Sequence, residues 1–319
     1  MIMVALFSSL LLGIGLPAAP AVEVDPLPLL KARLDSMCTY FRGRAGYSLK
    51  MLDSGRHISY RGDERFPTAS TIKTAVMLHA IREVEAGRMK WTDKRELPPK
   101  SKRLEWDTSV YSYYLQDGLS LDLDGYVNLM ISVSDNLATR ILREWLGTVN
   151  VNRSLTDLGF KDTLLLASAP KEETRLRRLG GQFGMGMTTP NEMNRMLEMF
   201  YRGTATSKAG SEKILRILQK QYWDDWIGVS VPPGVTAAMK SGAISRSRSD
   251  TAIVFAEKPY VLTIYTDSQK DQRWTTDNDG DKLLRQIAVL VWNSTQKRKY
   301  SPPTGSEKYL PTGGGLEGT

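Results

Sequence analysis

The feature that most constrains the fold of this chain is a long helical middle that separates two groups of strand-like segments. Segments with period-two alternation, divided by Gly- or Pro-containing turns, are typical of antiparallel hairpins. The strand-like segments are residues 47–52, 58–60, 235–240, 251–256 and 260–266. Their order predicts an α/β (α+β) fold, in which both ends of the chain complete a five-stranded antiparallel sheet flanked by helices, with an all-helical domain inserted.

The expected domain boundaries follow from this order. The sheet domain takes residues 23–87 and 226–297, and the helical domain takes residues 88–225. Apolar positions repeat at the helical period in 26–42, 71–86 and 281–292, and further helix-like patterns lie at 126–133, 137–145, 191–201 and 212–222. The tail 298–319 is rich in Gly and Pro, and we expect it to be disordered.

Residues 1–22 carry no charge, and an apolar run is followed by small residues that end near Ala21. This pattern predicts a signal peptide, a periplasmic or secreted protein and no stable membrane span after processing. The alternative is an uncleaved anchor, although the apolar run is short for a bilayer span. The single cysteine, Cys38, falls on the apolar stripe of a predicted helix, so we expect it in the core.

The formal net charge of +8 makes the surface basic, which can favour anionic partners. No Lys/Arg block is interleaved with aromatic residues, so nucleic-acid binding is not expected. No Cys/His cluster indicates a metal site. We expect a monomer that acts on a small molecule without a cofactor.

The segment Ser70-Thr-Ile-Lys73 carries the first sign of chemistry. On a helix, residues i and i+3 share a face, so the Ser70 hydroxyl would lie beside the Lys73 amine. A serine hydroxyl is a weak nucleophile that needs a base in contact, and a buried lysine can supply one. The chain has only two histidines and neither lies near a Gly-x-Ser-x-Gly pattern, so a Ser-His-Asp triad is not supported.

Two further motifs follow in order along the chain. Ser134-Asp-Asn136 lies between two predicted helices, and Lys240-Ser241-Gly242 ends a predicted strand. Ser-x-x-Lys with Ser-Asp-Asn and Lys-Thr-Gly is the signature of class A β-lactamases and penicillin-binding proteins, and Ser241 keeps the hydroxyl of the threonine it replaces. From about residue 40 to residue 295 the sequence therefore resembles this serine hydrolase family.

The resemblance implies a role for each matching residue. Ser70 would be acylated, Lys73 would move protons, and Ser134 would pass a proton to the leaving nitrogen with help from Lys240. Asn136 would bind the substrate amide and Ser241 the substrate carboxylate. The residues proposed for substrate binding are Asn136, Ser241, Gly242, Ala243 and Arg246, with the backbone N–H groups of Ser70 and Ala243 forming the oxyanion hole.

One part of the family pattern is incomplete. Class A β-lactamases use a loop glutamate in a Glu-x-x-Leu-Asn pattern to activate the deacylating water. Glu173-Thr-Arg-Leu-Arg177 keeps the glutamate and leucine but has arginine in place of asparagine, and Glu172 is its neighbour. The alternative is that these glutamates pair with basic residues on a solvated loop.

Three functions stay open at this point. The first is a β-lactamase that hydrolyses β-lactam antibiotics. The second is a D-Ala peptidase or esterase of the penicillin-binding type that acts on peptidoglycan peptides and deacylates slowly. The third is a non-catalytic binding protein, which has no need of Ser70, Lys73, Ser134 and Lys240 together. Arg246 and Arg248 would suit an anion or a charged hairpin tip, and any of Tyr111, Tyr113 and Tyr114 could supply an aromatic wall.

Overall fold

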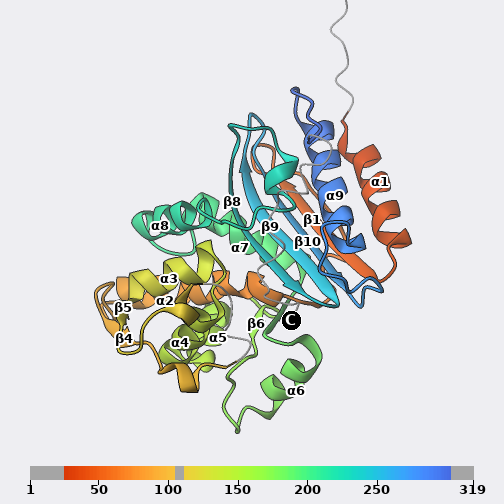
Figure 1. Cartoon of the computed structure of the whole chain (residues 1–319). Coiled ribbons are helices and arrows are strands. Elements are labelled where there is room, and N and C mark those ends of the chain that lie inside the picture. The colour runs from red at the N-terminus through yellow and green to blue at the C-terminus, as the bar shows by residue number, and fades with distance from the viewer. Residues whose placement is uncertain (1–24, 105–110, 303–319) are drawn as a thin grey trace, which may run out of the picture.

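A computed structural model describes residues 25–104 and 111–302 of the chain (Figure 1). The predicted signal peptide and most of the predicted disordered tail lie outside these ranges. Within them, no helix combines the length and the apolar character that a membrane crossing requires. The helices are α1 Leu27–Tyr40, α2 Lys73–Glu85, α3 Leu123–Ser132, α4 Asn136–Leu146, α5 Thr148–Asp157, α6 Thr174–Phe183, α7 Pro190–Arg202, α8 Lys208–Leu218 and α9 Asp279–Thr295.

The main sheet has five strands in the order β2-β1-β10-β9-β8, and every pairing is antiparallel. Its strands are β1 Arg44–Met51, β2 His57–Tyr60, β8 Thr236–Ile244, β9 Ser247–Phe255 and β10 Tyr260–Asp267. Strands from both ends of the chain therefore share one sheet, and the predicted fold class is confirmed. Because β8 lies at one edge, its outer side has no strand beside it.

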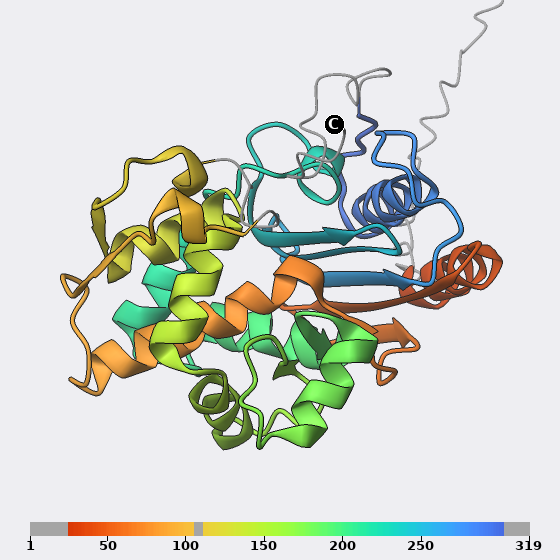
Figure 2. The ribbon, with the colours of Figure 1, turned by 60° about the horizontal axis from the view of Figure 1, so that its bottom comes forward.

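The two faces of the sheet are covered by different elements (Figure 1). Helices α1 and α9 pack on one face, where Leu34, Ile287 and Trp292 join the apolar side chains of the strands. Helices α7 and α8 contact the other face, and the turn that leads into α2 contacts β8 and β9. Figure 2 shows α2 running from the helical part of the molecule toward the sheet. The start of α2 is thus placed where the helices and the sheet meet.

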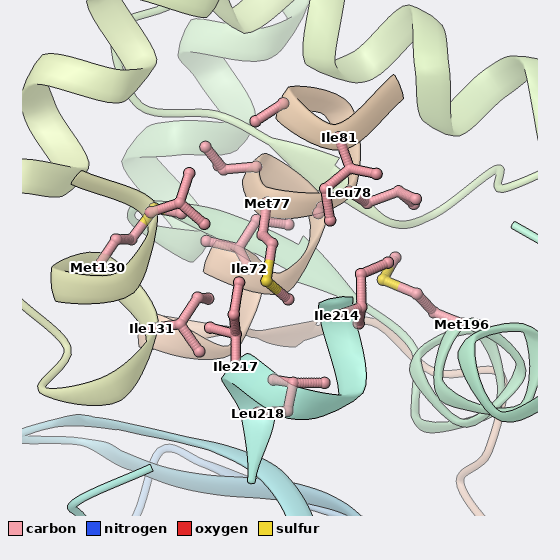
Figure 3. Close-up of a cluster of buried hydrophobic side chains, with 14 of the residues drawn as sticks. Ile72, Met77, Leu78, Ile81, Met130, Ile131, Met196, Ile214, Ile217 and Leu218 are labelled. Carbon is pink, nitrogen blue, oxygen red and sulfur yellow. The ribbon is translucent and has the colours of Figure 1, made fainter. Parts of the chain in front are cut away.

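The apolar side chains of α2 form the centre of the larger core (Figure 3). Met77, Leu78 and Ile81 of α2, with Ile72 just before it, are buried against side chains of α3, α7 and α8. Burying a large aliphatic side chain contributes about 1.5–3 kcal/mol. This packing fixes α2 from its start to Ile81, and it therefore fixes the residues at its N-terminus.

Short strands complete the structure away from the main sheet. They form two small antiparallel groups, β3-β7-β6 and β4-β5. Their bounds are β3 Phe66–Pro67, β4 Lys94–Glu96, β5 Ser120–Asp122, β6 Leu164–Leu165 and β7 Gly186–Thr188. The β3-β7-β6 group holds the segment before Ser70 against both ends of the loop that contains α6.

Some boundaries differ from those that the sequence predicts. Helix α8 starts earlier than residue 212, because Ser207 caps it by accepting a hydrogen bond from the Gly210 N–H, and it ends at Leu218 rather than 222. Strand β8 continues to Ile244 instead of ending at Lys240, because it pairs with β9 as far as the turn. The pattern also missed α5 and α6, whose sequences are polar.

Candidate active site

Ser70 lies in a single 3-10 turn, Ala69–Ile72, that leads directly into α2. Ala69 adopts a φ of +45°, which is uncommon for a residue with a side chain and marks a constrained turn. Strand β8 passes very close to this turn. A Cβ atom on Gly242 would lie 2.7 Å from both the Ser70 N and the Thr68 O, so only glycine fits there. The edge of the sheet is therefore held against the Ser70 N–H.

Lys73 is completely buried at the first position of α2. Its Nζ donates hydrogen bonds to the Ser134 O at 2.8 Å, the Ser134 Oγ at 3.1 Å and the Asn136 Oδ1 at 3.0 Å. Burial, followed by the charges of Lys240 and Arg143, holds the pKa of Lys73 well below its ordinary value, against the opposing charge of Asp135. The side chain is thus oriented by two motif residues and can give up its proton more easily than an exposed lysine.

The segment Ser134–Asn136 is held in position by Asp135. The buried carboxylate of Asp135 caps α4 by accepting a hydrogen bond from the Ala138 N–H. It also accepts hydrogen bonds from the N–H and the hydroxyl of Ser112. Ser134 itself has a φ of +58°. One carboxylate therefore connects this motif to the segment of Tyr111, Tyr113 and Tyr114, of which Tyr111 and Tyr114 are exposed.

Lys240 and Ser241 lie side by side on β8, the edge strand. Lys240 is fully buried and donates a hydrogen bond to the Ser241 O at 3.0 Å. Burial lowers the pKa of Lys240 to about 7, against the opposing effect of Asp250. The Ser241 hydroxyl accepts a hydrogen bond from the Gln221 Nε2 at 3.4 Å.

The proposed binding residues after Gly242 lie in different surroundings. Ala243 continues β8 and is half-buried opposite Arg248. Arg246, in the turn that follows, pairs with Asp267 and donates to the Gln182 O at the end of α6. Arg248 is buried and bonded to Asp281. The guanidinium groups therefore connect parts of the fold, and the structure gives neither of them a contact with Ser70 or Ser241.

The loop between β6 and β7 forms the remaining wall. A recess of about 380 Å³ adjoins Asn136 and is also lined by Thr139, Arg143, Ala167, Ser168 and Met185. No carboxylate is among these lining residues. Glu173 precedes the first residue of α6, is half-buried and caps no backbone N–H, and Glu172 is exposed. The described contacts of Lys73 and Asn136 therefore do not include the glutamates that the loop pattern singles out.

Sequence reasoning missed four residues that shape the site: Arg103, Ser112, Gln221 and Asp250. The Arg103 guanidinium is buried and donates to the carbonyl groups of Ser112, Tyr113 and Leu115. Asp250 is the only one with a sequence signal, since it is a charge at the start of an apolar run on a buried strand. In the described ranges, no group of three His, Cys, Asp or Glu side chains could hold a metal ion.

Comparisons with known proteins agree with this geometry. The family model described as the β-lactamase enzyme family matches residues 29–295. The β-lactamase CARB-4 of Pseudomonas aeruginosa is 28% identical over 267 residues, which cover 79% of this chain and 86% of the relative. A β-lactamase structure from Xanthomonas campestris superposes with a TM-score of 0.74 at 23% identity and covers 86% of this chain and 100% of its own. A mutant of PBP-A, solved as an acyl-enzyme complex with penicillin G, has a TM-score of 0.73 at 22% identity, with 85% and 98% covered. The chain therefore belongs to the β-lactamase enzyme family.

Proposed function

We propose that this enzyme opens β-lactam amide bonds through an acyl-enzyme on Ser70. The observation that carries the proposal is the hydrogen-bonded group of Lys73, Ser134 and Asn136 at the start of α2, directly after Ser70. Nucleophilic catalysis needs a base within reach of the attacking serine, and Lys73 lies one helical turn after Ser70. A binding protein has no such requirement, so the catalytic reading is preferred over a non-catalytic one.

The acylation step follows from the order of these groups. The Ser70 Oγ attacks the carbonyl carbon, and its proton passes to the neutral amine of Lys73. The Lys73 Nζ lies 3.1 Å from the Ser134 Oγ, so a proton can pass on to Ser134 while Ser134 gives its own to the leaving nitrogen. The C–N bond breaks as the C–O bond forms, and Lys240 favours the proton transfer by its charge.

The oxyanion that develops on the carbonyl oxygen needs two donors. The Ser70 N–H faces the edge of β8 at Gly242, and the N–H of Ala243 follows on the same strand. Backbone N–H groups fixed in this way stabilise negative charge without reorganisation during the reaction. We assign the oxyanion hole to Ser70 and Ala243, and the binding of the substrate amide to Asn136.

A second candidate function is supported by the recess beside Asn136. This recess has no carboxylate among its described lining residues, so a water molecule there has no evident base. An acyl-enzyme without such a base is long-lived, as expected for a D-Ala peptidase or esterase of the penicillin-binding type. Glu173 is the loop carboxylate to test for the opposite outcome.

The deciding experiment combines a fluorescent penicillin with nitrocefin. We expect the wild-type chain to be labelled covalently and Ser70→Ala to lose all labelling, while Ser59→Ala on β2 serves as a matched control. Labelling that survives Ser70→Ala would refute the nucleophile. Steady nitrocefin turnover supports the β-lactamase, and stoichiometric labelling without turnover supports the slowly deacylating enzyme.

We also propose that the enzyme works in the periplasm or outside the cell as a monomer. The uncharged apolar segment at residues 1–22 supports export. N-terminal sequencing of the protein from a periplasmic fraction would show whether the chain is cleaved near Ala21. Size-exclusion chromatography with light scattering would test the monomer.

A further inference from the structure

The exposed aromatic side chains of this protein gather near the active site. In the part of the chain that the structure describes, the exposed aromatic residues are Tyr40, Tyr111, Tyr114 and Tyr222. Tyr40 is the last residue of α1. The other three belong to two segments that are hydrogen-bonded to residues 132–135. Single exposed aromatic residues are ordinary, but several in one place indicate a binding surface.

Tyr222 is fixed next to Ser134 by hydrogen bonds to the backbone. Its N–H donates to the Ser132 O at 2.7 Å. The indole Nε1 of Trp223 donates to the Val133 O at 2.9 Å. The two acceptors are the residues directly before Ser134 in the chain. Tyr222 therefore lies beside the motif that holds the proposed proton donor to the leaving nitrogen.

The same segment also reaches the edge strand β8. The Gln221 Nε2 donates to the Ser241 hydroxyl at 3.4 Å. Residues 221–223 thus connect the segment of Ser134 with the strand of Ser241, which are the two motifs expected to contact the leaving half of the substrate. A side chain exposed from this connection is placed to meet the leaving half rather than the acyl group.

The ring of Tyr222 is accessible and its position is restricted by Trp223. Tyr222 is 53% exposed. The centroids of the two rings lie 4.9 Å apart, and the ring planes make an angle of 84°. Edge-to-face contacts of this kind stabilise aromatic pairs. A ring that is exposed but already held by a neighbour loses little conformational freedom when a ligand packs on it.

A second aromatic pair lies on the other hydrogen-bonded segment. The rings of Tyr113 and Tyr114 are also edge to face, with centroids 5.3 Å apart. The N–H and the hydroxyl of Ser112 hold this segment to the Asp135 carboxylate. The family resemblance already implies an aromatic wall here. Tyr222 adds a second aromatic surface, which comes from a different part of the chain.

The chemistry around Tyr222 suits an uncharged ring. Burial, followed by the neighbouring carboxylates, raises the pKa of Asp225 to about 8, so this group is mostly uncharged at neutral pH. The aromatic pair itself offers ring faces and ring edges, which attract the edges and faces of another aromatic ring. A saturated ring of similar size can use the apolar contact but not this complementarity.

We propose that Tyr222 is a specificity-determining residue that packs against a planar aromatic group on the leaving half of the substrate. The inference rests on the proposed acylation of Ser70 and deepens it by naming the substrate class. Acyl donors whose leaving half carries an aromatic ring are then better substrates than donors with a saturated ring at the same place.

Two thioesters with the same phenylacetylglycyl acyl group test the proposal. Their leaving thiols are 2-phenylethanethiol and 2-cyclohexylethanethiol, which share the two-carbon spacer that sets the reactivity of the sulfur. The measurement is kcat/KM from thiol release by the wild-type protein, with Ser70→Ala giving the uncatalysed rate. We expect the phenyl ester to react at least about threefold faster than the cyclohexyl ester, because an aromatic pair adds to the effect of apolar burial.

Variants assign the preference to the ring of Tyr222. Tyr222→Leu should bring the phenyl-to-cyclohexyl ratio close to one, whereas Tyr222→Phe keeps the ring and should keep the ratio. Tyr40→Leu is the matched control, because it removes an exposed tyrosine from the end of α1 and should leave the ratio unchanged. Thermal melting shows whether each variant is folded.

The outcomes separate the two proposals, because labelling by a fluorescent penicillin is followed in the same samples. A wild-type ratio near one, or no cleavage of either ester by a protein that penicillin labels at Ser70, overturns the aromatic proposal alone. A preference that survives in folded Tyr222→Leu, or disappears in Tyr222→Phe, overturns the assignment to this ring. If neither the esters nor penicillin react in a Ser70-dependent way, the proposed function fails and the aromatic proposal fails with it.

Discussion

The two walls that meet at Ser70 are built differently. On the side of α3 and α4, Lys73 donates hydrogen bonds to Ser134 and Asn136, and Asp135 between them accepts hydrogen bonds from Ser112. Each of these contacts joins residues far apart in the sequence. On the side of the β6–β7 loop, Ala167, Ser168 and Met185 face the same Asn136 across an open recess. The first wall therefore holds a buried lysine against two motif residues, whereas the described lining residues of the second include no carboxylate.

The largest effect should come from removing the centre of the organised wall. Lys73→Met deletes the amine that contacts Ser134 and Asn136 while keeping much of the buried volume. We expect the second-order rate of penicillin labelling to fall by roughly 10²–10⁴-fold, the usual contribution of a general base. Lys50→Met is the control, because it removes a lysine of β1 that pairs with Glu198 of α7. A rate close to that of the wild type would show that Lys73 is not the base.

The second effect concerns Lys240 and pH. Its pKa is about 7, so its protonated form dominates below that pH and is lost above it. If its charge assists acylation, the labelling rate should fall by up to about tenfold per pH unit above 7. Deprotonation of Lys73 has the opposite effect on the labelling rate, because losing its proton makes Lys73 a base.

Lys240→Arg tests this assignment, because an arginine keeps its charge throughout that range. We expect the alkaline fall in the labelling rate to disappear, even if the larger side chain lowers the maximum. The measurement is the pH profile of labelling from acid to alkaline buffer. An alkaline fall at the same pH in the variant would assign it to another group.

The third effect is on stability rather than rate. Asp135→Asn keeps the size of the side chain but cannot accept all three hydrogen bonds from Ser112 and Ala138. We expect the free energy of unfolding in urea to drop by about 1–3 kcal/mol. Asp122→Asn, at the half-exposed cap of α3, should cost much less, because asparagine is also a good cap. Equal losses would contradict a special role for Asp135.

The smallest effect is expected on the open wall. Glu173 precedes α6 and makes no described contact with Lys73 or Asn136, so Glu173→Gln should leave acylation and deacylation unchanged. The measurement is the lifetime of the penicillin adduct by mass spectrometry. An adduct that accumulates only in the variant would instead identify Glu173 as the deacylating base and make the two walls more alike than the structure shows.

The sequence by itself determined the fold class and predicted the residues of the main site. The strand-like segments near both ends predicted the five-stranded antiparallel sheet, because the alternation of side chains is a local property of a strand. The three motifs named Ser70, Ser134 and Lys240 because their residue types and order are local features too. The proposed domain boundaries stay predictions.

Only the tertiary structure decided how these residues meet. The hydrogen bonds from Lys73 to Ser134 and Asn136 depend on the packing of α2 against α3 and α4, which no local pattern specifies. The close approach of Gly242 to Ser70 and the pairing of Asp250 with Ser241 also depend on the tertiary structure, because the whole sheet sets the register of its strands. The sequence predicted which groups react. The packing of distant elements decided that Lys73, Ser134 and Asn136 come together, and that the recess beside Asn136 has no carboxylate among its described residues.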